Sequence, residues 1–355
     1  MDKLTETLSK LSQLCGPAGY EGEARKAIIE EARKCTDDVE VDAIGNVYAT
    51  VRGSSSQSTI LVDAHMDEVG FIIKYVEDRG FLRFETLGTI DSRILPGNRI
   101  ILKGTEKNLH GTIGSKPPHI ISGEEASKVI PFYDLFMDVG AVTGDEARSL
   151  GLSVGTIGTF DEPFRELAGS LVMGKAFDDR AGCTVALAVM EALSREKAKM
   201  SVVFAFTAQE ELGMRGAEIA VRHVNPDIAI ALETTVAADV PDARPRDWIS
   251  SIGLGPTIRV MDSSMVAQHV MVDYLRDTAE KNSIPHQMQL AKAGGTDAGK
   301  IHLSGTSGVA TGLISTPCRY LHGPSSVLST KDLHNVVRLT EASIRGMESK
   351  EQFRL

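Results

Sequence analysis

Two apolar segments near the middle of the chain restrict its fold more than any other feature. Met200–Thr207 and Asp227–Leu232 are almost entirely apolar, which predicts strands buried on both faces, and the segment between them has helical spacing. Such a strand-helix-strand unit gives parallel strands with a right-handed crossover. The first strand is followed by Glu210 and Glu211, and the second by Glu233. Because open α/β sheets bind ligands at this carboxyl edge, we expect a site there.

A third apolar strand, Thr59–Ala64, runs directly into His65, Met66 and Asp67. Residues two apart in an extended segment share a face, so His65 and Asp67 point the same way at the end of the strand. Two interpretations fit this pair. The aspartate can bond to the histidine for structural reasons alone, or the histidine can bind a metal while the aspartate holds its other ring nitrogen.

A pair of adjacent aspartates, Asp178 and Asp179, lies where a loop enters the apolar helix Val185–Leu193. The N-terminus of a helix favours negatively charged groups. Taken alone, an aspartate that caps the helix beside a solvated neighbour is the simpler explanation. The acids and histidines at other strand ends make a ligand role the stronger hypothesis.

The middle of the chain has a different residue pattern from the rest. Residues 73–164 contain short alternating strands separated by Gly and Pro, which predicts a small β-rich domain inserted into an α/β domain of residues 1–72 and 165–355. The predicted fold class is therefore α/β, a mixed sheet sandwiched by helices, with the inserted β-rich domain. Further predicted elements are helices over 3–15, 21–34, 144–150, 215–223, 266–283 and 330–349, a hairpin over 39–51 and a strand over 309–314.

Length and charge exclude several classes of protein. The chain has 355 residues, enough for about two domains, and its net charge of −10 disfavours binding to nucleic acid or to an anionic membrane. No apolar signal core follows Met1, and no apolar run reaches membrane-spanning length. The four cysteines are far apart and form no CxxC pair, so we expect a cytoplasmic protein with reduced cysteines.

The acids and histidines at the strand ends form a set that could bind metal. Two histidines and three carboxylates suit a pair of divalent cations, with one carboxylate bridging them. Imidazole nitrogen favours zinc or cobalt, because magnesium prefers oxygen ligands. Of two adjacent glutamates, one can be a ligand while the other accepts a proton from water as general base. The candidate residues are His65, Asp178, Glu210, Glu211, Glu233 and His322.

With these residues in view, the chain resembles the M42 family of metallo-aminopeptidases over essentially its whole length. This family includes tetrahedral aminopeptidases, glutamyl aminopeptidases and proteins once labelled endoglucanases. Each motif alone has weak to moderate specificity, but seven in family order are highly specific. The segments that carry the resemblance are Asp63–Gly70, Gly111–His119, Asp138–Ala141, Lys175–Gly182, Gln209–Ala217, Gly294–Ala298 and Arg319–His322.

The resemblance implies a metallopeptidase catalytic domain with two divalent metal ions per subunit. Asp178 would bridge the two ions. His65 and Glu233 would complete one site, and Glu211 and His322 the other. Zinc or cobalt is the expected metal, with manganese as a further possibility.

The resemblance also implies roles around the metal ligands. Glu210 would be the general base, and Asp67 would orient the imidazole of His65. Gly295 and Thr296 would line the substrate cleft. The peptide bond between Asp178 and the next aspartate would be cis, as in similar enzymes.

The activity that the resemblance implies is hydrolysis of the N-terminal residue from short peptides with a free N-terminus. The inserted domain would form dimers that build a homo-oligomer, a tetrahedral dodecamer. One alternative is a related two-metal hydrolase that acts on N-acyl amino acids or as a carboxypeptidase. A glycoside hydrolase needs an acid and a carboxylate flanking a sugar, and acids accompanied by histidines disfavour it. A non-catalytic scaffold is disfavoured because no expected ligand or base is missing.

The chain departs from the common family pattern in two places. Glu233 stands where many members have aspartate, and its extra methylene leaves binding through one oxygen or two both open. Gly323-Pro-Ser-Ser follows His322, where many members have Ser-Pro and then an acid. We expect His110 and His119, which have no neighbouring acids at ligand spacing, to be structural or surface residues. The histidines on helices or loops without partners are also expected not to be ligands, namely His223, His269, His286, His302 and His334.

Overall fold

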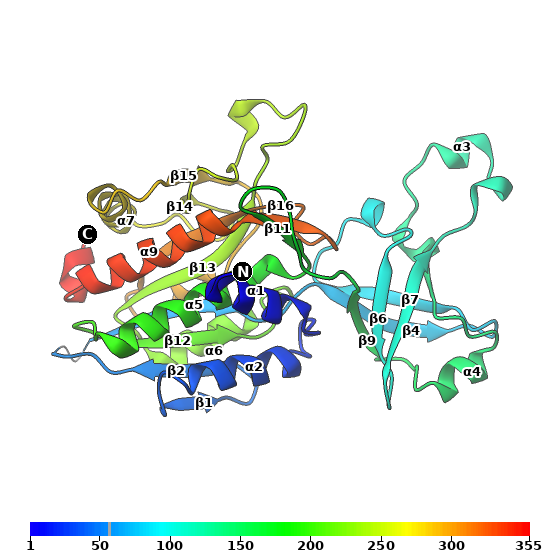
Figure 1. The fold of residues 1–355 in the computed structure, drawn as a ribbon, viewed down its shortest axis with the longest axis horizontal. Helices are drawn as coiled ribbons and strands as arrows, with labels where there is room; N and C mark the ends of the chain where they lie inside the picture. Colours follow the sequence, from blue (N-terminus) through cyan, green and yellow to red (C-terminus); the bar gives the residue numbers. More distant parts are fainter. Residues whose placement is uncertain (56–57) are drawn as a thin grey trace.

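The computed structural model describes residues 1–55 and 58–355, and it consists of a large mixed sheet with helices and a separate closed barrel (Figure 1). The prediction of an α/β domain with an inserted β-rich domain is confirmed. In spatial order, the path through the sheet is β1 (Val39–Val41), β2 (Val47–Val51), β12 (Ser201–Thr207), β3 (Thr59–His65), β13 (Ile228–Val236), β16 (Ala310–Arg319), β17 (Ser326–Ser329), β11 (Leu171–Gly174) and β10 (Arg165–Glu166).

The centre of the sheet is parallel. β12, β3, β13 and β16 run in the same direction, and both outer parts of the sheet add antiparallel strands. The register sets His65 beside Thr207, so that the ends of β3 and β12 meet at one edge. Two further strands lie off this path: β14 (Thr257–Met261) pairs with β16, and it also pairs with β15 (Gln287–Leu290).

Helices cover both faces of the sheet, as the apolar strands require. Ile60 and Val62 of β3 belong to the larger core, whereas Leu61 between them belongs to a smaller core on the other face. The longer helices that contribute to the larger core are α1 (Lys3–Gln13), α2 (Gly22–Ala32), α5 (Phe177–Arg195), α7 (His269–Lys281) and α9 (Thr330–Gly346). Those that contribute to the smaller core are α6 (Arg215–Val224) and α8 (Ala298–Ile301).

The barrel stands beside the sheet and has its own hydrophobic core (Figure 1). Its centre holds Phe71, Phe84 and Phe160, whose rings meet edge to face. Its strands in spatial order are β4 (Gly70–Val76), β5 (Leu82–Leu87), β8 (Phe136–Asp138), β7 (Asn108–Gly114), β6 (Arg99–Lys103) and β9 (Ile157–Phe160). Its short helices are η1 (Ser92–Ile94), η2 (Pro118–Ile120), α3 (Gly123–Ala126), η3 (Phe132–Asp134) and α4 (Gly144–Ser149).

Two strand boundaries differ from the prediction. β13 continues to Val236, so Glu233 lies inside the strand rather than after it. β16 continues to Arg319, past the predicted end at residue 314, and brings the chain close to His322. The added residues of these two strands include threonines, a proline and a cysteine. Neighbouring strands in the sheet bury them, so their burial does not come from an apolar sequence pattern.

Two remaining short helices lie outside the barrel, η4 (Pro245–Asp247) and η5 (Lys350–Phe353). In the part of the chain that the structure describes, no helix combines the length and the apolarity needed to cross a membrane.

Candidate metal centre

The predicted metal ligands converge at the carboxyl edge of the parallel strands. His65 is the last residue of β3, and Glu233 lies within β13. Asp178 lies at the start of α5, whereas Glu211 follows β12 and His322 follows β16. Residues from five separate segments therefore meet because the parallel strands end, and the loops begin, at one edge.

Asp178 lies between the two histidines. Its Oδ1 is 3.3 Å from Nε2 of His65, and its Oδ2 is 3.1 Å from Nε2 of His322. Each histidine has a second carboxylate nearby: Glu233 Oε2 is 3.6 Å from His65 Nε2, and Glu211 Oε1 is 3.1 Å from His322 Nε2. The side chains form two groups of three possible ligands, each with its ligand atoms within 4.8 Å of one another, and Asp178 belongs to both.

The two adjacent aspartates at the start of α5 have different roles. The peptide bond between Asp178 and Asp179 is cis, as the family resemblance implies, and both residues have non-helical backbone angles. Oδ1 of Asp179 accepts a hydrogen bond from the Gly182 amide at 2.9 Å, so Asp179 caps the helix. A Cβ at residue 182 would lie 2.1 Å from Asp179 Oδ2, which explains the glycine. Asp178 is thereby left to face the histidines.

Asp67 connects the two sides of the site. Its Oδ1 lies 3.5 Å from Nδ1 of His65, the ring nitrogen that faces away from Asp178. The same carboxylate accepts hydrogen bonds from the backbone amides of Glu210 at 2.9 Å and Glu211 at 3.1 Å. Asp67 is fully buried, so these contacts are shielded from water.

The site concentrates negative charge in a buried place. Burial raises the pKa of Glu233 and of Glu210, and nearby carboxylates add to the effect although His65 opposes it. Burial alone would lower the pKa of His322, but the nearby carboxylates of Asp178 and Glu211 outweigh this and raise it to about 11. Buried carboxylates are costly unless cations neutralise them.

The residues present fit a pair of divalent cations. Glu211 Oε1 is buried and has no aligned hydrogen-bond donor, although His322 Nε2 approaches it to 3.1 Å. Two imidazoles and three carboxylates, one of them shared, supply nitrogen and oxygen donors of the kind that zinc and cobalt accept.

A cavity of about 570 Å³ opens beside the metal-ligand groups. Gly295 and Thr296 line it, and so does Glu210. The sequence analysis missed Arg259, which also lines the cavity and is 5% exposed. Its Nη1 lies 3.1 Å from Asp262 Oδ2. The signal that could have revealed it is an arginine inside an otherwise apolar strand, since buried arginines are rare unless paired.

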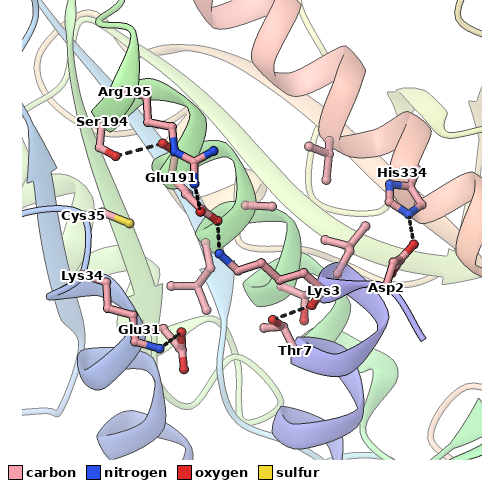
Figure 2. A pocket seen from close by; sticks show the side chains of 15 residues that line it. Asp2, Lys3, Thr7, Glu31, Lys34, Cys35, Glu191, Ser194, Arg195 and His334 are labelled. Carbon is pink, nitrogen blue, oxygen red and sulfur yellow. Dashed lines mark hydrogen bonds and ion pairs between the residues drawn. The ribbon is translucent and has the colours of Figure 1, made fainter.

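A second cavity of equal volume, about 570 Å³, lies among α1, α2, α5 and α9 (Figure 2). Its charged side chains pair with one another: Lys3 and Arg195 both contact Glu191, and Asp2 contacts His334. None of its lining residues belongs to a metal-ligand group found among the described residues. The chemistry therefore points to the first cavity.

Three of the other histidines have an acidic partner, and the prediction that His223 and His334 have none is wrong. These contacts join residues far apart in sequence on the protein surface, so no local pattern could reveal them. Each is an ion pair or hydrogen bond to one carboxylate, and none belongs to a three-ligand group in the described part of the chain. The pairs are His110 with Asp161, His223 with Glu40 and His334 with Asp2.

Comparison with known proteins identifies the family. The sequence model of the family described as M42 glutamyl aminopeptidase matches residues 45–339. The chain belongs to the M42 family of metallo-aminopeptidases. A putative aminopeptidase of Acetivibrio thermocellus is 35% identical over 97% of this M42 chain and 99% of its own length.

Solved structures of aminopeptidases are similar to this M42 chain over nearly its whole length. A TET aminopeptidase from a marine-sediment thaumarchaeote has a TM-score of 0.96 and 35% identity, covering 99% of both chains. The TET1 peptidase of Pyrococcus horikoshii, which can assemble into a tetrahedron or a large octahedral shell, has a TM-score of 0.86 and 34% identity, covering 97% of this chain and all of its own.

The shared position of Asp178 leads to a test of metal stoichiometry. Asp178→Ala should lose both metal ions, whereas Glu233→Ala should lose only one, because Glu233 belongs to a single group. Elemental analysis of the purified variants measures the ions per chain. Asp332→Ala, which removes a buried carboxylate outside both groups, serves as the control and should keep the wild-type content. Equal metal content in Asp178→Ala and wild type would contradict the bridging assignment.

Proposed function

We propose that this chain is a dinuclear metal-dependent aminopeptidase that removes the N-terminal residue from short peptides. The observation that carries the proposal is the position of Asp178, whose two oxygens face different histidines and which belongs to both ligand groups. Residues 1–72 and 165–355 would form the catalytic domain, and residues 73–164 the assembly domain. We expect the enzyme in the cytoplasm, in keeping with its four free cysteines.

In the proposed reaction, Glu210 acts as the general base. When bound, the two metal ions would lower the pKa of a water molecule and polarise the peptide carbonyl. Glu210 lines the cavity beside the ligand groups, where its carboxylate can take the proton of that water and pass it to the leaving amine. Asp67 fixes the backbone of Glu210 and the ring of His65 at the same time. Because Asp67 contacts both residues, the position of Glu210 is fixed relative to the ligand His65.

The proposed metals are zinc or cobalt, with manganese as a further candidate. Histidine in each ligand group favours zinc or cobalt. Glu233 takes the place of the aspartate that is common in the family. Its Oε2 faces His65, while the backbone amide of Asp297 lies 3.4 Å from its Oε1. We therefore propose that Glu233 binds through one oxygen.

The first test asks whether the substrate needs a free amine. A free amine is basic and suits a cavity rich in carboxylates, whereas acylation removes its basicity and adds bulk. The kcat/KM of an N-acetylated short peptide should therefore collapse relative to that of the free peptide under the same metal conditions. Equal or faster cleavage of the acetylated peptide would favour a hydrolase of N-acyl amino acids.

A second test separates the adjacent glutamates. Glu210→Gln keeps the size of the side chain but cannot accept a proton, so turnover should fall by about 10²–10⁴ while both metals stay bound. Glu211→Gln should instead weaken metal binding, because Glu211 belongs to a ligand group. Turnover and metal content are measured on the same samples. Loss of metal only in Glu210→Gln would show that the two roles are reversed.

The third test concerns assembly. We propose that the inserted domain forms dimers that build a dodecamer, by analogy with the solved PhTET1 dodecamer and with the TET1 peptidase that can assemble into a tetrahedron. The barrel exposes large apolar side chains that support this, among them Tyr75 at 56% and Tyr133 at 76% exposure. Light scattering at micromolar concentration should report a particle many times the mass of one chain. A monomer that is fully active on short peptides would contradict the proposal.

A further inference from the structure

Buried side chains hold the backbone of the loop that carries Glu210. The residue before it, Gln209, has a φ of 58°, a left-handed conformation that residues other than glycine rarely adopt. The loop therefore depends on outside contacts to keep this shape. Four consecutive amides donate to buried side chains: Ala208 to Asn46, Gln209 to Glu21, and Glu210 and Glu211 to Asp67.

Glu21 is the most distant of these acceptors, 188 residues before Gln209 in the sequence. Its Oε1 accepts hydrogen bonds from the amides of Gly19 at 2.6 Å and Gln209 at 3.2 Å. Its Oε2 lies 3.2 Å from Nη2 of Arg25. Glu21 is 1% exposed and does not line the cavity, so it cannot contact the substrate directly. Its contacts with the site pass through the backbone of Gln209.

The segment that ends at Glu21 is also tied to the loop that contains Asp67. The Ala18 amide donates to the carbonyl of Glu68, and the Glu68 amide donates to the carbonyl of Gly16. The Glu68 carboxylate accepts from the Gly16 amide at 3.0 Å and from Lys175 Nζ at 2.8 Å. Residues 16–21 are therefore fixed to one catalytic loop while Glu21 contacts the other.

We propose that Glu21 is a positioning residue that fixes the backbone of Gln209 and so places Glu210 relative to Asp67. The inference rests on the proposed role of Glu210 as general base. In this proposal, residues 16–21 connect the loop that carries Asp67 to the loop that carries Glu210. A small displacement of a catalytic group is enough to slow a reaction strongly, by about 10²-fold for 1 Å.

Three substitutions of Glu21 test this role. Glu21→Gln keeps an acceptor oxygen at the same reach and should keep most of the activity. Glu21→Ala removes the acceptor, and Glu21→Asp withdraws it by one methylene while keeping the charge beside Arg25. Both should lower kcat by about 10- to 100-fold, because Glu210 directly follows Gln209 and shifts with it. KM and metal content should stay unchanged, because Glu211 keeps its amide contact with Asp67 and the other ligands lie on other segments. If Glu21→Ala fails to fold, the Gln and Asp variants carry the comparison.

A matched control separates positioning from general stability. Asp227 accepts a hydrogen bond from the Thr59 amide at 3.0 Å, but at the other end of the strands. Asp227→Ala should lower the melting temperature and leave kcat unchanged. A wild-type kcat in Glu21→Ala or Glu21→Asp would overturn the inference, and so would equal losses in Glu21→Gln and Glu21→Ala. Failure of the proposed function would show differently, as a wild-type enzyme without activity on free-amine peptides.

Discussion

Neutralisation of buried negative charge is the constraint on which the rest of the structure depends. The strands β3, β12 and β13 are buried over most of their length, and the acids at or just after their carboxyl ends are buried or half-buried. Carboxylates placed there cannot be solvated, and an isolated buried carboxylate is far too costly to keep ionised. Two histidines and a shared aspartate spread this charge over two groups that two divalent cations can balance. The position of the site therefore follows from the topology of the sheet.

The loops at this edge are held by buried polar contacts rather than by their own structure. Glu68 is the clearest case, because its carboxylate contacts Lys175, the Gly16 amide and Thr159 of the barrel. A buried pair of this kind adds little net stability, but removal of one partner leaves an unpaired charge. Such contacts allow only one arrangement of the loops. Catalytic groups on loops need this support if they are to keep a fixed geometry.

Prediction from the sequence was most accurate for segments whose environment is uniform along their length. The three central strands could be predicted because apolar residues at every position mean burial on both faces, and their ends placed His65 and the glutamates. The short strands β10 and β17 escaped prediction. Both residues of β10 are exposed at the edge of the sheet, and β17 is buried by its neighbours β16 and β11 rather than by a pattern of its own. The contact of Glu21 with the Gln209 amide joins segments 188 residues apart in the sequence. No local spacing encodes such contacts, so only the structure reveals them.

The order of the ligands along the chain determines when the metal-ligand groups can form during synthesis and folding. His65 and Asp178 are 113 residues apart with the barrel between them, and Asp178 and His322 are a further 144 apart. Such long-range contacts form late in folding. Because synthesis proceeds from the N-terminus, His322 is made 144 residues after Asp178. A chain interrupted before His322 therefore lacks one of the two ligand groups, so any chemistry that needs both groups can begin only after this residue is made.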